Sequence, residues 1–529
     1  MQEKKVFVRE SSGLVREIDA KDAFSMNFSY LGPAAGVAYP LSFAAVLAGA
    51  NWLLSGILAA IIMAPVAVMY YYLSRLIPRS AGDYIYISRT LGPRLGFVQA
   101  IANVFVFASG VPILAQLELP LVLEPSLQAL GLTFHDPSLI SLANDFSFSS
   151  ETSPAFFAAT LVIIALATLV ATIRTKVFAR VVTVLTAVQI VGTIAMIIGL
   201  ALVNSSYPQA FTKVSQAFGG PSYSSLTSST PSYFDPLQTL VLMSAIAAFL
   251  FLYNNAPTYF GGEIKKAERS LFHGIVLSYI VTAILSIALI AELQFFVGEG
   301  FYDYTSSVGW TSSNGAGIPI APNSLLSYVV VPFINDAPLV VIMVAGAITW
   351  YLLYAILDLA IPSRTLFAMA FDWLAPTFFT KVSERFGTPI YSTLFIAALA
   401  VVFDVLEIYF GFSESALTTL IVFMLYQYFT AAISAIVISR RKLYGVNDNK
   451  LAILGAISAF SVAFPAVLMI VYGVINGDFG STVFVDLPLN LGIIIGVPLV
   501  SLALYEVARK VRERQGIDLS LTFKEIPPE

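Results

Sequence analysis

The sequence predicts an all-α integral membrane protein with twelve transmembrane helices. Its composition is 58% hydrophobic and 11% charged, and its mean hydropathy is +0.83, whereas about a quarter of the residues of a soluble domain are charged. Apolar segments long enough to cross a bilayer recur along the whole chain. All but one of the 28 Lys and Arg residues lie in alternate connections between these segments.

Twelve apolar segments, none containing Lys or Arg, define the predicted spans. A helix rises 1.5 Å per residue, so about 20 apolar residues cross a hydrocarbon core of roughly 30 Å, and longer segments cross with some tilt. The fourth segment is the shortest and still meets this length. In chain order the spans cover 24–48, 51–74, 97–122, 155–173, 181–203, 238–260, 273–297, 338–360, 390–411, 416–438, 452–476 and 485–508.

The basic residues mark one side of the predicted membrane domain. They lie before the first span, in every second connection after it and beyond the last span, whereas Lys213 alone falls on the other side. Cytoplasmic loops of membrane proteins are enriched in Lys and Arg. Both termini are therefore predicted to be cytoplasmic, as an even number of spans also requires, in a multi-pass protein of the cytoplasmic (plasma) membrane.

The chain is predicted to form a single membrane unit between two short tails. The amino-terminal tail is polar and mixed in charge, so no cleavable signal peptide is expected. The predicted units are a cytoplasmic tail at 1–22, a twelve-helix domain at 23–508 and a cytoplasmic tail at 509–529, the domain comprising repeat one at about 23–203, repeat two at about 237–438 and the last two helices at about 452–508.

Several classes of site are excluded by residues that the sequence lacks. Without Cys there are no disulfides or thiol sites, and the isolated His135 and His273 do not have metal-ligand spacing. No nucleotide-binding loop, paired catalytic groups or nucleic-acid-binding surface is found. We therefore expect no enzyme activity, cofactor or metal. Asn204 begins a possible glycan acceptor on the outer side, where an unmodified loop is the favoured expectation.

Two predicted spans are interrupted at mid-depth. Gly32, Pro33, Ala34, Ala35 and Gly36 interrupt the first span, and the segment 253–257, which contains Tyr253, Asn254, Asn255 and a Pro, interrupts the sixth. Irregular backbone inside a bilayer leaves polar groups unpaired unless it lines a cavity or is buried in protein. Each break is a candidate binding site, with a Pro kink or small-residue packing as the alternative for either one alone.

The spacing of the breaks favours the binding-site interpretation. Five spans separate them, so a unit of spans one to five and a unit of spans six to ten would enter the membrane from opposite faces. The breaks would then occupy matching positions in two inverted repeats, a pattern typical of transporter sites near the membrane midplane.

The ends of broken helices could bind both charged groups of an amino acid. Exposed N–H groups at a helix start suit a carboxylate, and carbonyls at a helix end suit an ammonium group or a cation. Pro33 fits a helix start, and Ala35 and Gly36 allow close approach to the backbone. Phe249 could close over a ligand, with packing as its alternative role. These positions, together with those of the two breaks, form the predicted substrate site.

Asp358 is the most informative acidic residue in the predicted spans. It lies near the inner end of the eighth span among apolar residues, and carboxylates in membranes are costly and usually functional. We predict either that it binds a proton or Na⁺ in coupled transport or that it pairs structurally with Arg364 or with a cation of a cytoplasmic loop. No span contains Lys or Arg, so neutral or cationic amino acids are favoured over strongly anionic substrates.

Three loop motifs resemble those of the amino acid, polyamine and organocation superfamily of secondary transporters. They are SAGDYIY at 80–86, GEIKK at 262–266, and SRTLFAMAFD at 363–372, which continues to GTP at 387–389. The resemblance covers nearly all of the spans. It implies two inverted five-helix repeats, with substrate held between discontinuous helices one and six. By position, it also implies that Phe249 is a gating aromatic.

The chain departs from the family pattern at several positions. Ala34 replaces the first Gly of the motif in the first span, Trp373 replaces a Gly after the third loop motif, and Tyr253 stands where many members have Gly. Gln189 stands where some proton-coupled relatives have Lys. The coupling ion therefore does not follow from the resemblance.

The sequence as a whole predicts a secondary active transporter of amino acids that works by alternating access in the lipid bilayer. Coupling to a proton gradient, to a sodium gradient or to exchange is expected. A transporter of polyamines or other organic amines is the alternative within this class. An uncoupled facilitator or channel, or a transporter-like nutrient sensor, is the alternative of another class.

Overall fold

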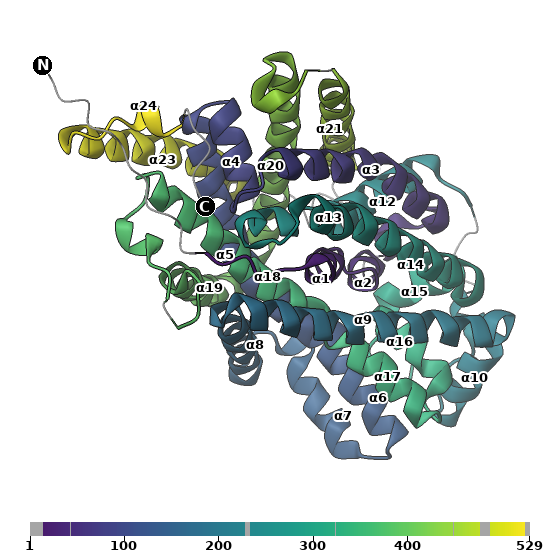
Figure 1. The fold of residues 1–529 in the computed structure, drawn as a ribbon. Coiled ribbons are helices and arrows are strands. Elements are labelled where there is room, and N and C mark those ends of the chain that lie inside the picture. The colour runs from purple at the N-terminus through teal and green to yellow at the C-terminus, as the bar shows by residue number, and fades with distance from the viewer. Residues whose placement is uncertain are drawn as a thin grey trace, which may run out of the picture.

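The computed structural model describes residues 14–42, 44–227, 233–322, 324–383, 385–447, 449–476 and 487–523. Residues 1–13 and 524–529 of the predicted tails lie outside the described residues. Within the described ranges the protein is all-helical, and pairing between extended segments is limited to isolated β-bridges. Eleven helices in these ranges are long and apolar enough to cross a membrane. Figure 1 shows the arrangement of the helices.

The helices of the structure, in chain order, are α1 (Ala20–Leu31), α2 (Ala35–Leu41), α3 (Trp52–Leu76), α4 (Gly82–Thr90), α5 (Pro93–Glu118), α6 (Glu124–Thr133), α7 (Pro137–Ala143), α8 (Pro154–Thr172), α9 (Thr175–Val203), α10 (Tyr207–Ala217), α11 (Tyr223–Thr227), α12 (Pro236–Ile246), α13 (Ala267–Leu271), α14 (Ser278–Glu292), α15 (Glu299–Val308), α16 (Leu325–Val330), α17 (Ala337–Ala347), α18 (Trp350–Phe371), α19 (Ile390–Phe410), α20 (Ser413–Arg440), α21 (Lys450–Asn476), α23 (Leu487–Arg514) and α24 (Leu519–Thr522).

The first predicted span is divided between two short helices. α1 has 12 residues and α2 has 7, so neither reaches membrane-spanning length alone. Asp19 starts α1 with a capping box, and Gly32 ends it in the left-handed conformation at φ +54°. A Cβ atom on Gly32 would collide with the hydroxyl of Tyr354. The sequence therefore stops α1 where α18 approaches it.

The sixth predicted span loses its regular hydrogen bonding in stages. α12 continues as a π-helical turn at Ala247–Phe251, and a short 3₁₀ helix follows at Ala256–Tyr259. The residues between these two turns are not helical. Pro257 has no backbone N–H, so it cannot donate the hydrogen bond that would continue an α-helix through this segment. The two breaks predicted from the sequence are both present in the structure.

The eighth predicted span contains an interruption that the sequence did not predict. α17 ends and α18 begins around Ile348 and Thr349. The carboxylate of Glu118, on α5, accepts a 3.1 Å hydrogen bond from the backbone N–H of Tyr351. A buried carboxylate thus satisfies a donor at the start of α18, a position where negative charge is favourable.

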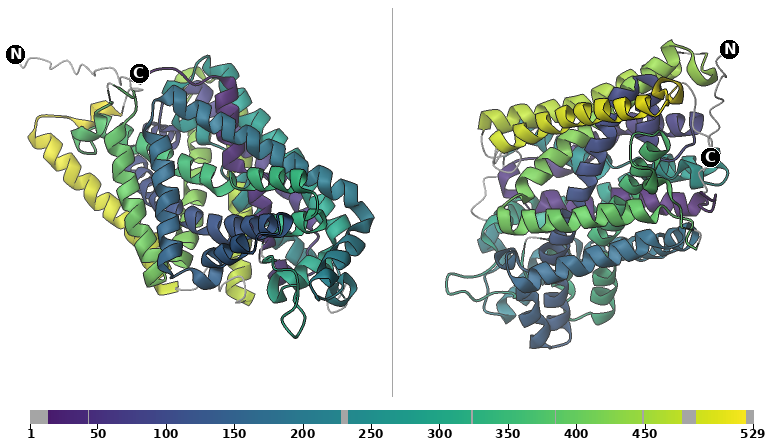
Figure 2. Two further views of the ribbon diagram at one scale, coloured as in Figure 1. Left: turned by 90° about the horizontal axis from the view of Figure 1, so that it is seen from below. Right: turned by 90° about the vertical axis from the view of Figure 1, so that its left-hand side faces the viewer.

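The discontinuous first span lies at the centre of the bundle. α1 and α2 occupy the middle of the view in Figure 1, and α1 packs against α9, α14 and α18. α23, the yellow helix, runs along the outside in both views of Figure 2 and packs against α5 and α20. The helices that carry the predicted site are therefore enclosed by the rest of the protein.

Candidate functional site

A cavity lies between the break in the first span and the π-helical turn of the sixth. Its volume is about 60 Å³. A water molecule needs roughly 10–15 Å³ measured in this way, so the cavity has room for a few water molecules or one compact organic molecule. The residues that line it are Tyr30, Ala35, Gly36, Tyr39, Gly110, Ile113, Leu114, Leu117, Phe249, Tyr253, Tyr351, Tyr354, Asp358 and Leu420.

Aromatic rings form much of the cavity wall. The ring of Tyr30 meets the ring of Tyr253 edge to face at 5.2 Å between centroids, and it meets the ring of Tyr354 at 6.0 Å. Tyr39 and Phe249 form a second pair at 4.6 Å. These rings come from α1, α2, the sixth span and α18, so the cage closes only when all four segments are assembled.

Asp358 is the carboxylate of this wall. It is 4% exposed, and its Oδ1 accepts a 2.8 Å hydrogen bond from the hydroxyl of Tyr30. Its Oδ2 faces Gly110 of α5, where an added Cβ would lie 3.0 Å away. Among the described residues, no cation forms an ion pair with Asp358. Arg364, its predicted alternative partner, pairs with Glu263 instead.

One tyrosine that lines the cavity has a buried hydroxyl without a hydrogen-bond partner in the described part of the chain. Tyr351 is 3% exposed, and its hydroxyl makes no hydrogen bond within the described part of the chain. The hydroxyl of Tyr354, by contrast, donates a 2.8 Å hydrogen bond to the carbonyl of Leu31 at the end of α1. Buried polar groups usually have partners, so the Tyr351 hydroxyl is available to a ligand in the cavity.

Four of the predicted substrate-site residues line the cavity. They are Ala35, Gly36, Phe249 and Tyr253. Gly36 also lets α2 approach the sixth span, since an added Cβ would lie 2.5 Å from Cδ1 of Leu250. Its lack of a side chain is therefore required for helix packing as well as for access to the backbone.

The other residues of the first break shape it without lining the cavity. Gly32 supplies the left-handed turn, Ala34 is fully buried, and the carbonyl of Pro33 accepts a 3.3 Å hydrogen bond from Ser286 on α14. These contacts satisfy or bury the irregular backbone, as membrane depth requires.

The two amides of the second break point away from the cavity. Asn254 accepts a hydrogen bond from Asn27 of α1. Asn255 donates to Asp83 at 2.9 Å and accepts from Tyr428 at 2.8 Å. Neither amide is among the cavity-lining residues. In this structure both therefore tie the irregular segment to neighbouring helices.

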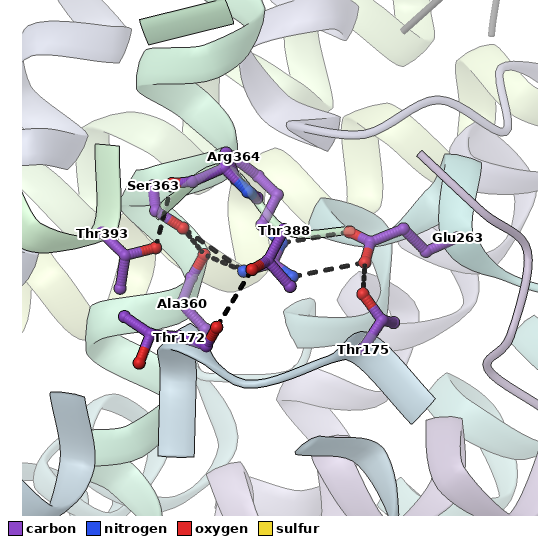
Figure 3. A network of polar contacts seen from close by, with 9 residues as sticks. Thr172, Thr175, Glu263, Ala360, Ser363, Arg364, Thr388 and Thr393 are labelled. Atoms are coloured by element: carbon purple, nitrogen blue, oxygen red, sulfur yellow. Dashed lines mark hydrogen bonds and ion pairs between the residues drawn. The ribbon is translucent and has the colours of Figure 1, made fainter. Parts of the chain in front are cut away.

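A buried ion pair joins α18 to the loop that follows the sixth span. The guanidinium of Arg364 contacts Glu263 through Nε at 3.0 Å and Nη2 at 3.2 Å, and Thr175 donates to the same carboxylate at 2.8 Å. Figure 3 shows this network, with Arg364 also near Ser363. Arg364 stacks at 4.5 Å on the ring of Phe260.

A second buried ion pair lies where α4 meets the end of α18. Arg89 of α4 forms two hydrogen bonds, of 2.6 and 2.7 Å, with Asp372 at the end of α18, and Tyr84 donates to the same carboxylate at 2.6 Å. Tyr84 of the SAGDYIY motif therefore meets Asp372, the last residue of the SRTLFAMAFD motif. The Arg89–Asp372 pair fastens the end of α18 to α4.

The segment before α1 is fixed to the same region. The backbone N–H groups of Glu17 and Ile18 donate to the carbonyl of Glu263 at 2.9 and 3.0 Å. The Arg174 guanidinium hydrogen-bonds the Glu17 carboxylate and lowers its pKa below the usual value. The start of the first span, the loop after the sixth and the start of α9 are thus connected.

Nine residues that line the cavity were not predicted from the sequence, namely Tyr30, Tyr39, Gly110, Ile113, Leu114, Leu117, Tyr351, Tyr354 and Leu420. Part of the signal was present. Tyr351, Tyr354 and Asp358 follow the i, i+3, i+7 spacing of one helix face, which places two tyrosines beside the predicted carboxylate. Gly110 and the tyrosines of the first span carry no comparable local signal.

Comparisons with known proteins complete the description of the site. A family model described as amino acid permease matches residues 21–497. A relative, "Uncharacterized protein 399" of Sulfolobus islandicus rod-shaped virus 1, is 25% identical over 446 residues, which cover 84% of this chain and 86% of the relative. The matched region of the family model includes every residue that lines the cavity.

Proposed function

Because the chain belongs to the amino acid permease family, we propose that it is a secondary transporter that carries neutral or cationic amino acids, or related amines, across the cytoplasmic membrane by alternating access. Family membership confirms the resemblance predicted from the loop motifs and identifies a multi-pass membrane transporter rather than an enzyme. The observation that carries the proposal is the cavity between the two helix breaks, with Asp358 in its wall.

The proposed architecture has twelve spans in two inverted five-helix repeats followed by two further helices. α1 and α2 together count as the first span, and the discontinuous sixth span corresponds to it in the second repeat. Support comes from the cavity, which both breaks flank. Substrate sites at the meeting point of two broken helices are typical of such repeats.

Alternating access requires the two sides of the cavity to open in turn. On the proposed cytoplasmic side, the Arg364–Glu263 and Arg89–Asp372 pairs are buried, and both pairs tie α18 to neighbouring segments. Opening on this side would hydrate these charges, which offsets part of the lost attraction. We propose that these two pairs close the cytoplasmic side and separate in each transport cycle.

The proposed coupling residue is Asp358. A buried carboxylate in a membrane is costly unless a cation, a proton or hydrogen-bond donors compensate it. The hydroxyl of Tyr30 provides one donor. Exchange of a proton, Na⁺ or a cationic group at this carboxylate would connect substrate movement to a gradient.

Gln189 of α9 stands where some proton-coupled relatives have Lys. Its amide atoms are buried and have no hydrogen-bond partner in the described structure.

The proposal is tested by uptake into liposomes containing the purified protein. Labelled amino acids and polyamines are supplied with an imposed proton or Na⁺ gradient, and empty liposomes measure passive entry. We expect saturable uptake that accumulates substrate in response to one gradient. Saturable equilibration without accumulation would indicate a facilitator or an exchanger, and a flux that does not saturate would indicate a channel. Absence of uptake with binding retained would indicate a sensor.

A further inference from the structure

The cavity wall carries a single formal charge among the residues that line it. Asp358 is acidic, and neither Lys, Arg nor His belongs to the lining set. The titratable groups facing Asp358 are tyrosines, namely Tyr30 from α1, Tyr253 from the sixth span and Tyr354 from α18 itself. The wall is therefore anionic when Asp358 is ionised, and no resident cation compensates it.

The other elements packed around Asp358 contribute no cation to the cavity either. α5 presents Gly110 to the carboxylate, and its Glu118 faces the backbone N–H of Tyr351 instead. α20 presents Leu420 to the cavity, whereas its Tyr428 donates to Asn255. Among the described residues, no side chain supplies a cation to Asp358, so the group that neutralises it is a bound cation or a proton.

The chemistry of the wall indicates the kind of cation. A metal cation of the Na⁺ or Ca²⁺ type prefers several oxygen ligands. The side-chain oxygens of this wall are one carboxylate and tyrosine hydroxyls, and the hydroxyls of Tyr30 and Tyr354 already donate to Asp358 and to the carbonyl of Leu31. Aromatic faces around a carboxylate suit an ammonium group, which gains both the charge attraction and cation–π contacts. The unpartnered hydroxyl of Tyr351 adds a further polar contact for the same ligand.

We infer that the cavity selects a compact organic amine with a net positive charge, whose ammonium group binds Asp358 inside the tyrosine cage, and that a proton takes the same carboxylate when the amine is absent. The inference rests on the proposed function and names its substrate class. A net cation neutralises the buried carboxylate, whereas a zwitterion would leave one uncompensated negative charge in a site of low polarity. The cavity volume of about 60 Å³ restricts the amine to a small size.

Shared use of one carboxylate makes transport an exchange. The ammonium group displaces the proton, which leaves to water on the side that is open. Release of the amine on the other side allows a proton from that side to return to the carboxylate. One proton thus moves outward for each amine that moves inward, and no net charge crosses the membrane.

The test uses three small molecules of matched size. Alaninamide is a net cation, alanine is its zwitterionic counterpart, and lactamide has a hydroxyl in place of the ammonium group. Binding to the purified full-length protein is measured by calorimetry. We expect alaninamide to bind at least about tenfold more tightly than alanine, a difference that an uncompensated charge readily produces, and lactamide not to bind. Equal or tighter binding of alanine would overturn the inference and leave the proposed amino acid transport intact.

Proton competition gives a second measurement that needs no variant. Lowering the pH should weaken alaninamide binding by up to about tenfold per unit, and an alaninamide gradient should drive counterflow of protons in proteoliposomes. Empty liposomes measure the leak of the uncharged base. Binding that does not change with pH would contradict the shared carboxylate. Failure of all three molecules and of every amino acid tested would contradict the proposed function itself.

Asp358→Asn should abolish alaninamide binding and proton counterflow. Gly492→Ala provides a matched control, because an added Cβ there meets no atom within 4 Å. If Asp358→Asn does not fold, Tyr30→Phe keeps the ring and removes only the hydroxyl that donates to Asp358. That variant should still bind alaninamide more tightly than alanine, and loss of this preference would overturn the inference.

Discussion

The hydroxyl of Tyr30 donates a 2.8 Å hydrogen bond to Oδ1 of Asp358, although 328 positions separate the two residues in the chain. This contact joins the last turn of α1, just before the first break, to the middle of α18. It makes the geometry of the break and the position of the carboxylate depend on each other. Movement of either segment would change how the charge of Asp358 is compensated.

Gly36→Leu should abolish substrate binding and uptake. An added Cβ would lie 2.5 Å from Cδ1 and 3.1 Å from Cα of Leu250, so the larger side chain must displace the sixth span or fill the cavity. Uptake into proteoliposomes measures the effect. Gly492→Leu is the control, since the space beside Gly492 is open. Wild-type uptake by Gly36→Leu would contradict a site at the first break.

Asn255→Ala should lower both the stability of the protein and its affinity for substrate. Asn255→Ala removes a donor to the buried carboxylate of Asp83 and should lower stability by about 1–2 kcal/mol. We expect reduced substrate affinity as well, because the break loses its anchor. Melting temperatures in detergent and substrate affinities give both values. Asn144→Ala, at an exposed position, is the control. An unchanged melting temperature for Asn255→Ala would contradict the anchoring role.

Arg364→Ala should destabilise the buried ion pair that we propose closes the cytoplasmic side. Glu263 would remain buried with a hydroxyl donor but without its cation, at a cost of about 3–5 kcal/mol for a buried pair. Arg364→Ala combined with Glu263→Ala should recover part of this loss, because the remaining charge is removed as well. Thermal unfolding of the single and double variants forms the cycle. Additive losses would show that the pair contributes no coupling energy.

The contact between Glu17 and Arg174 predicts a pH dependence. The pKa of Glu17 is lowered in the folded protein, so the contact stabilises the fold above the usual pKa of a glutamate. This contribution is lost as the pH falls through the lowered pKa. The difference in melting temperature between wild type and Glu17→Gln should therefore disappear in acid. A difference that persists in acid would contradict this assignment.

Sequence patterns predicted the long apolar helices and both of the breaks, because span length and Pro, Gly and amide residues at mid-depth are local signals. The interruption around Ile348 and Thr349 was not predictable in this way. It is stabilised by Glu118, which belongs to another helix, and no Pro or Gly stands at the two positions. Interactions between distant segments decided this feature.

The candidate site was predicted only in part, for the same reason. Asp358, Phe249 and Gly36 could be selected from residue type and depth, and all three line the cavity. Asn254 and Asn255 were selected with equal reason, yet their partners are Asn27 and Asp83 on other helices. The direction of a side chain at a break depends on which neighbours offer a hydrogen bond, and a single sequence does not specify those neighbours.

Tyr351→Phe should separate ligand binding from stability. The hydroxyl of Tyr351 is buried without a partner in the described structure. Its removal should therefore leave the free energy of unfolding unchanged or raise it by up to about 1 kcal/mol, and the melting temperature should follow. Substrate affinity should fall by about fivefold, because the ligand loses one typical hydrogen bond to this hydroxyl. Tyr354→Phe is the matched control, because its hydroxyl donates to the carbonyl of Leu31 and its loss should lower stability. A lower melting temperature for Tyr351→Phe with unchanged affinity would show that the hydroxyl has a structural role instead.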